Sequence, residues 1–187
     1  GDDITENARQ IRDIPKKLPV AKAIEVRGEI YMRLSVFERF KAEGMANPRN
    51  LAAGAIKQKD PKKSAAYELS FAAYDLVGDA HGTQVAELEH LVALGFAPID
   101  HFVLRREEMA RGFEEFSNRR AQLDYEIDGV VYKVNLLKEQ QRLGHTSHHP
   151  RYAIAYKFQG DAGTTTLVDI EWSVARTGAI TPVAIVE

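Results

Sequence analysis

The chain has no cysteine among its 187 residues, which excludes disulfide bonds and metal sites built on thiolates. It also lacks any long apolar run, so we expect no membrane-spanning helix and no membrane partner. The opening residues, GDDITENARQIRDIP, are polar and contain no apolar segment of the kind found in signal peptides. Together these absences favour a cytoplasmic protein.

Neither sign of charge is in large excess, because the chain has 25 Lys and Arg residues and 27 Asp and Glu residues, which give a net charge of -2. Any binding of nucleic acid must therefore use local basic patches. Hydrophobic residues make up 44% and charged residues 28% of the chain, as in ordinary globular domains. The chain begins with Gly1 and stops in PVAIVE, a strand-like segment, so we expect a piece of a longer protein.

The hydrophobic pattern predicts a mixed α+β fold. Alternating or apolar segments predict strands at 23–32, 68–78, 125–135 and 151–159, while helical spacing predicts helices at 34–44, 83–95 and 106–123. The first of these helices would be capped near Ser35 and stopped by Gly44. In residues 164–187 the alternation of apolar and polar residues differs from that of the preceding strands, and RTGAI is typical of a hairpin turn. We therefore place a domain boundary near Gly163.

The segment NPRNLAAGAIKQKDPKK, residues 47–63, combines a helix of very small residues with flanking cations. Asn47-Pro48 is typical of a turn, and Asn50 of a helix cap. Small residues would let a large or charged ligand approach the backbone. The lysines that follow either contact a DNA backbone or form an ordinary solvated face.

Seven charged residues stand where the pattern predicts apolar ones: Glu29, Arg49, Lys57, Arg120, Asp128, Lys133 and Lys157. Five of the seven are cations, and such a set suits a phosphate site with a divalent metal. Lys133 and Lys157 lie in predicted strands, where an amine is excluded unless an anion meets it. Strict alternation would put Asp128 and Lys133 on opposite faces, and a bulge at Gly129 would reconcile them.

Each of these residues also has a structural interpretation. Arg120 occupies a gap in the apolar stripe of the helix at 106–123, but it could instead reach solvent or pair with Asp124 or Glu126. Lys133 would protect an edge strand, and Glu29 would be a solvated strand residue. The histidines of GHTSHHPR could bind a metal, although neighbouring histidines in one loop seldom converge on one ion.

Four segments, VRGEIYM, NPRNLAAGAIKQKDP, EIDGVVYKVN and PRYAIAYKF, resemble in order and character the successive motifs of bacterial NAD-dependent DNA ligases. The opening residues and the closing TGAITPVAIVE resemble that family as well. The resemblance implies that residues 1–163 form a nucleotidyltransferase (ATP-grasp-like) adenylation domain with antiparallel sheets, lacking its N-terminal part. Residues 164–187 would then be the first strands of an OB-fold β-barrel.

The resemblance also implies a reaction. In that family a lysine attacks NAD, forms lysyl-AMP and releases nicotinamide mononucleotide. AMP then moves to the 5′-phosphate of nicked duplex DNA, and the neighbouring 3′-hydroxyl displaces it. By resemblance, the full-length protein is a monomeric, cytoplasmic bacterial enzyme whose substrates are NAD and nicked duplex DNA, with Mg²⁺ or Mn²⁺ as metal.

The resemblance also implies a role for each residue that matches one of the family's motifs. Glu29 would hold the AMP ribose, Tyr74 would stack on adenine and Val131 would pack beside the base. Lys133 and Lys157 would bind the α-phosphate.

The remaining roles concern metal, phosphates and DNA. Asp128, with Glu29, would support the metal, and Arg49 and Arg120 would orient phosphates. The expected contacts with DNA come from Arg49, Lys57 and Arg176.

Two departures from the family pattern bear on function. The nucleophilic lysine of the family lies in a Lys-x-Asp-Gly motif, which is absent here, so we expect these 187 residues to be inactive alone. We also expect the family's nicotinamide-binding, zinc-binding, helix-hairpin-helix and BRCT parts to lie outside these 187 residues. Lys57 stands where arginine is common, and lysine loses the bidentate grip. Two alternatives stay open, a non-catalytic nucleotide- or nucleic-acid-binding module and an ATP- or GTP-using relative.

Overall fold

The computed structural model describes residues 2–42, 44–45, 47–78, 81–160 and 163–187. The chain divides into two compact units, Gly1–Lys157 and Phe158–Glu187, called unit 1 and unit 2 below. The predicted mixture of helices and antiparallel strands is confirmed, because every sheet pairing of the described strands is antiparallel. The domain boundary near Gly163 stays a prediction.

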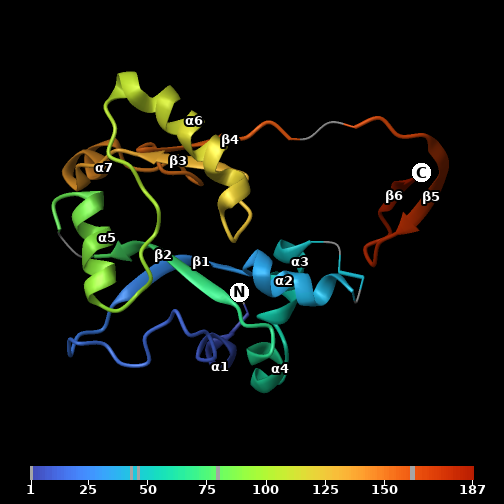
Figure 1. The fold of residues 1–187 in the computed structure, drawn as a ribbon, viewed down its shortest axis with the longest axis horizontal. Helices are drawn as coiled ribbons and strands as arrows, with labels where there is room; N and C mark the ends of the chain where they lie inside the picture. The colour runs from blue at the N-terminus through green and yellow to red at the C-terminus, as the bar shows by residue number, and fades with distance from the viewer. Residues whose placement is uncertain (1, 43, 46, 79–80, 161–162) are drawn as a thin grey trace. The chain divides into compact units, whose positions relative to one another are not determined.

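Unit 1 combines small helices with two two-stranded sheets (Figure 1). Its strands are β1 (Glu25–Tyr31), β2 (Ser70–Val77), β3 (Gly129–Lys133) and β4 (Ala153–Lys157). Its helices are α1 (Thr5–Ala8), α2 (Leu34–Lys41), α3 (Pro48–Ala55), α4 (Pro61–Ala65), α5 (Gln84–Ala93), α6 (Met109–Arg119) and α7 (Leu137–Leu143), with 3₁₀ turns at Arg106–Glu108 and Arg120–Gln122. The strands are shorter than predicted, chiefly at β3 and β4.

Helix α3 begins at Pro48, and its cap corrects the prediction made for Asn50. Asn47 is the N-cap residue, and its side-chain oxygen accepts the backbone N–H of Asn50 at 2.8 Å. Proline suits the first helical position, because its missing N–H has no partner there in any helix. The sequence Asn-Pro is therefore the helix start itself.

Helix α2 is capped by a residue far away in the chain, rather than by Ser35 as predicted. The Asp124 carboxylate accepts the backbone N–H of Ser35 at 2.8 Å and its hydroxyl at 2.7 Å. These hydrogen bonds lower the pKa of Asp124 below its usual value. Asp124 thereby ties the segment before β3 to the start of α2.

The β1–β2 sheet contains a bulge that determines where Tyr74 lies. The register shifts between Arg27 and Gly28, which pair with Asp75 and Ala73, so Tyr74 is the extra residue on β2. A bulge inserts one unpaired residue and re-aims its side chain. The β3–β4 ladder, by contrast, runs from Gly129 to Lys133 without a shift, so the bulge proposed at Gly129 is wrong.

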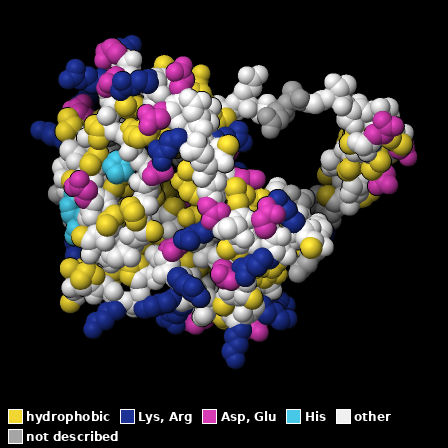
Figure 2. All heavy atoms as spheres, viewed as in Figure 1, with side chains coloured by type: hydrophobic (Ala, Val, Ile, Leu, Met, Phe, Trp, Pro, Cys, Tyr) yellow, Lys and Arg dark blue, Asp and Glu magenta, His cyan; other side chains and the backbone are white. Residues whose placement is uncertain are grey.

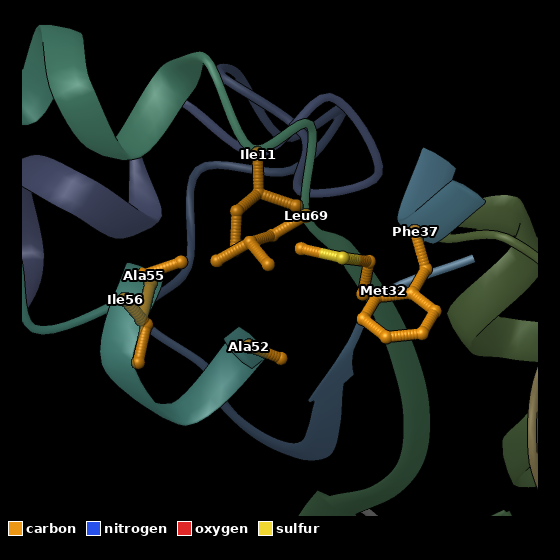
Figure 3. Packing of buried hydrophobic residues seen from close by; sticks show 7 residues of the cluster. All are labelled: Ile11, Met32, Phe37, Ala52, Ala55, Ile56 and Leu69. Atoms are coloured by element: carbon orange, nitrogen blue, oxygen red, sulfur yellow. The ribbon is translucent and has the colours of Figure 1, made fainter. Parts of the chain in front are cut away.

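The main core of unit 1 lies between β1 and helices α2 and α3 (Figure 3). Its buried residues are Ile11, Met32, Phe37, Ala52, Ala55, Ile56 and Leu69. Ile11 and Leu69 lie against each other, and Met32 lies beside the Phe37 ring. The small residues of α3 are therefore explained in part by close packing. A second cluster, centred on Leu76 and Leu91, joins β2 to α5.

Unit 2 is a two-stranded hairpin of β5 (Leu167–Val174) and β6 (Ile180–Val186). The turn predicted at RTGAI is confirmed, since Ala175 N–H donates to the Ala179 carbonyl at 2.8 Å. Figure 2 shows hydrophobic and acidic side chains mixed over this hairpin, and Trp172 is 67% exposed. Among the described residues, every helix falls short of the length and apolarity needed to cross a membrane.

Candidate functional site

The β3–β4 hairpin presents two different faces. Residues paired across an antiparallel ladder point to the same side, so Lys133 and Lys157 share a face with Val131, Ala153 and Ala155. This shared face is called the lysine face below. Its middle carries small or short side chains, and a lysine stands at each end.

The opposite face of the hairpin is covered only in part by α6, because Ile154 and Tyr156 on that face are 62% and 56% exposed. Tyr132 on that face donates its hydroxyl hydrogen to the Met109 carbonyl at 2.7 Å. The ring of Tyr156 meets the ring of Phe113 edge-on, with 4.7 Å between centroids. The hairpin is therefore held to α6 through Tyr132 and Tyr156, while the lysine face is left accessible to a ligand.

The two lysines are less buried than predicted and stand at strand ends. Lys133 is the last residue of β3 and Lys157 the last residue of β4, whose residues are mostly exposed. The lysines lie four ladder positions apart, about 13 Å along the strands. The structure therefore does not bring the two amines together. Each amine has its own partner.

One end of the lysine face carries an ion cluster, to which α3 contributes Arg49. The Asp128 carboxylate lies 3.1 Å from Lys157 Nζ and 3.6 Å from Arg49 Nη1. The hydrogen bond from Lys157, assisted by both positive charges, lowers the pKa of Asp128. Asp128 lies directly before β3, so strand alternation does not apply to it. Three of the six residues predicted for phosphate and metal chemistry, Arg49, Asp128 and Lys157, thus meet.

The other end of the lysine face meets the bulge in β2. Lys133 Nζ donates to the Tyr74 carbonyl at 3.4 Å and lies 5.2 Å from the centre of the Tyr74 ring. An amine over an aromatic face is a cation–π contact. The Tyr74 side chain is 39% exposed, which leaves part of its ring open to a ligand. Tyr74 is therefore not a core residue.

Glu29 and Val131 also lie on accessible surface. Glu29 is exposed and pairs with Ala72 in the β1–β2 ladder. Its carboxylate makes no hydrogen bond or ion pair with any residue that the structure describes. Val131 is 62% exposed, in the middle of the lysine face.

Three further predicted cations lie apart from these clusters. Arg120 follows the end of α6 and is exposed, so its predicted place on the apolar stripe is wrong. The arginine against that stripe is Arg119, which contacts the Phe116 ring and pairs with Asp100 at 3.1 Å. Lys57 pairs with Asp2 at 3.1 Å, and Arg176 belongs to unit 2.

The described residues contain no group of three or more His, Asp or Glu side chains positioned to hold a metal ion. Asp128 nevertheless has the chemistry that Mg²⁺ requires, because carboxylate oxygen is its preferred ligand and the lowered pKa keeps the group ionised. Two cavities among the described residues, of about 60 and 260 Å³, are lined by residues other than Lys133, Lys157 and Asp128.

A buried polar network beside Lys133 was not found from the sequence. Gln84, Glu87 and Gln140 are 8%, 3% and 7% exposed. Glu87 accepts hydrogen bonds from the backbone N–H of Leu76 at 3.0 Å and from Gln84 at 2.9 Å. Only partners distant in sequence distinguish these residues from surface helix residues. No local pattern therefore reveals them.

Burial raises the pKa of Glu87, and nearby Asp75 raises it further, against the opposing effects of the Leu76 N–H, Gln84 and Lys133. A raised folded-state pKa means that charging the carboxylate costs more in the folded state than in the unfolded state. Its contribution to stability is therefore present at low pH and is lost as pH rises through the folded-state pKa. Glu87→Gln removes this loss, because the amide does not titrate.

We therefore expect the free energy of unfolding of Glu87→Gln, relative to the unsubstituted chain, to rise with pH from the usual glutamate pKa, about 4.3, upward. Urea unfolding at a series of pH values measures it. Glu89→Gln is the matched control for replacing a carboxylate by an amide, because Glu89 is exposed on the same helix. A difference for Glu87→Gln that falls with pH would contradict the assignment.

Comparison with known proteins identifies the family. The sequence model of the family described as "NAD-dependent DNA ligase adenylation domain" matches residues 1–161. A DNA ligase of Bacillus licheniformis is 45% identical over 200 residues, covering 100% of this chain and 30% of that protein.

Two other relatives agree with this match. A DNA ligase of Limosilactobacillus fermentum is 44% identical, covering 100% of this chain and 29% of that protein. A DNA ligase of Acinetobacter baumannii is 42% identical, covering 98% of this chain and 30% of that protein. The chain thus spans about three tenths of the length of these curated relatives. The family match covers most of the chain, and the chain belongs to the family of NAD-dependent DNA ligase adenylation domains.

Proposed function

We propose that the chain is the nucleotide-binding part of an NAD-dependent DNA ligase, which seals nicks through lysyl-AMP and DNA-adenylate intermediates. The observation that carries the proposal is the lysine face. It combines an open strip of small side chains with an ion cluster at one end and, at the other end, a lysine beside an accessible aromatic ring. The names of the relatives, all DNA ligases, support the same reaction.

The chemistry of the reaction fits these groups. Transfer of an adenylyl group requires charge neutralisation and in-line positioning rather than an elaborate acid–base pair. Lys133 and Lys157 each carry a compact charge on a long flexible stem, so both amines can turn toward one α-phosphate from opposite ends of the lysine face. In this proposal the phosphate replaces Asp128 and the Tyr74 carbonyl as their partners.

The remaining predicted roles are proposed on the same basis. The Tyr74 ring stacks on adenine, Val131 packs beside it and Glu29 accepts hydrogen bonds from the ribose. An exposed carboxylate that has no partner among the described residues suits that role for Glu29.

Metal and phosphate contacts are proposed for the ion cluster. Asp128, with Glu29 as a second carboxylate, would hold Mg²⁺ or Mn²⁺, which would neutralise phosphate charge. Arg49, already beside Asp128, orients the phosphate. Arg120 is proposed to do the same from outside the cluster.

Contacts with nicked duplex DNA are proposed for Arg49, Lys57 and Arg176. Unit 2 is proposed to be the start of an OB-fold, because its exposed apolar residues on both strands require further strands to cover them. A cytoplasmic, monomeric enzyme with NAD as adenylate donor completes the proposal.

The direct test is adenylation of the full-length protein. Incubation with NAD and Mg²⁺, followed by intact-mass measurement, should add one AMP, and the product should seal a nicked duplex. ATP or GTP should give no adduct. The 187-residue chain alone contains no Lys-x-Asp-Gly sequence and should stay unmodified. Absence of any adduct on the full-length protein would contradict the ligase function and favour a non-catalytic binding module.

A further inference from the structure

The start of α5 is fastened to the segment that follows β3. Gln84 N–H donates to the Asn135 carbonyl at 2.7 Å, and Val85 N–H donates to the Asn135 side chain at 3.2 Å. Leu137 N–H donates to the Gly82 carbonyl at 3.0 Å. Because Lys133 ends β3, these bonds begin within two residues of the proposed phosphate-binding amine.

Buried side chains strengthen the same junction. Gln140 on α7 donates to the Val134 carbonyl at 2.7 Å and to Gln84 Oε1 at 3.1 Å. Gln84 in turn donates to Glu87 at 2.9 Å and to the Tyr74 carbonyl at 3.4 Å. The chain of hydrogen bonds therefore runs from the backbone just after Lys133 to the bulge in β2.

The Tyr74 carbonyl is where this network meets Lys133, because it accepts from both Gln84 and Lys133 at 3.4 Å. A bulged residue has lost its ladder partner, so its position depends on other hydrogen bonds. Buried amides and a buried carboxylate are costly to leave unpaired, which makes such a network rigid once it is satisfied.

We propose that Gln84, Glu87 and Gln140 form a clamp that holds the Tyr74 backbone beside the end of β3, where Lys133 stands, and that they are positioning residues for adenylate binding. None of the three is assigned to contact the nucleotide. The clamp fixes the relative position of the group proposed to stack on adenine and a group proposed to bind the α-phosphate. This inference rests on the proposed function, but the geometry that it describes can be tested without activity.

The test compares Gln140→Leu with Gln141→Leu in the full-length protein. Leucine matches glutamine in size and helix propensity but makes no hydrogen bonds. Gln141 is exposed on the same helix and is the matched control. An amine over an aromatic ring gives its neighbouring methylene a ring-current shift, which ¹³C-lysine NMR detects for Lys133. Tyr74→Leu supplies the unshifted reference.

We expect the Lys133 methylene resonance of Gln140→Leu to move to its position in Tyr74→Leu, while Gln141→Leu retains the original shift. Single-turnover self-adenylation at saturating NAD should fall about tenfold to a hundredfold in Gln140→Leu, with little change in KM, because the groups are misplaced rather than removed. Gln84→Leu provides a second variant if Gln140→Leu does not fold.

An unchanged Lys133 resonance in folded Gln140→Leu would overturn the clamp. So would a shifted resonance with an unchanged adenylation rate, since the clamp would then not position reacting groups. If the unsubstituted protein does not self-adenylate, the proposed function fails, and the resonances alone decide whether the clamp exists.

Discussion

Replacement of Lys133 or Lys157 by methionine should lower single-turnover adenylation of the full-length protein by about a hundredfold to a thousandfold, the usual cost of losing one hydrogen-bond donor to a reacting group. Each amine now binds a weak partner, the Tyr74 carbonyl or the exposed Asp128 carboxylate. Both are therefore free to exchange these partners for a phosphate.

The control for this prediction is Lys138→Met, because Lys138 is exposed on α7, five residues beyond Lys133. Its rate should equal that of the unsubstituted protein. Thermal stability should change little in all three variants, since the Lys157–Asp128 pair is largely exposed and such pairs contribute about 0–1 kcal/mol. If the rates of both lysine variants stay within about threefold of that of the unsubstituted protein, these amines do not take part in the reaction.

Gly129→Ala should destabilise unit 1 by about 1–3 kcal/mol, the usual cost of overpacking. A Cβ at this position would lie 2.5 Å from the Tyr156 carbonyl oxygen and 2.8 Å from the Lys157 Cα, both backbone atoms of β4. The strands must separate to relieve these contacts. Because Asp128 and Lys157 flank this point, their hydrogen bond should break and adenylation should fall as well.

Gly54→Ala is the contrasting control. A Cβ there meets no atom within 4 Å, and Gly54 lies inside helix α3, where alanine is favoured by up to about 1 kcal/mol. Chemical denaturation should therefore show opposite signs for the two substitutions. A neutral Gly129→Ala would mean that β3 and β4 are not held as closely as the structure places them.

The elements themselves were readable from the sequence because their signals are local. Alternation in AIEVRGEIYM predicted β1, and helical spacing ended by Gly95 predicted α5. The hairpin of unit 2 followed from RTGAI. Helix caps were harder to predict from the sequence, because the carboxylate that caps α2 belongs to Asp124, 89 residues after Ser35.

The site was predictable in its residue types but not in its arrangement. Asp128, Lys157 and Arg49 were singled out as misplaced charges, and they meet. The bulge that turns Tyr74 toward Lys133 depends on the pairing of two strands, which no single segment encodes. The buried network of Gln84, Glu87 and Gln140 depends likewise on tertiary contacts. Alternation overestimated the burial of the lysines, because it cannot tell a covered face from an open one.

The most direct test of the account is whether one nucleotide engages both ends of the lysine face. In the full-length protein with ¹³C-labelled lysine, Lys133→Arg and Lys157→Arg variants assign the two methylene resonances. Titration with AMP should shift both resonances, saturably and with one common dissociation constant. If only one resonance responds, or if the two give different constants, the amines do not converge on a shared adenylate and the account is contradicted.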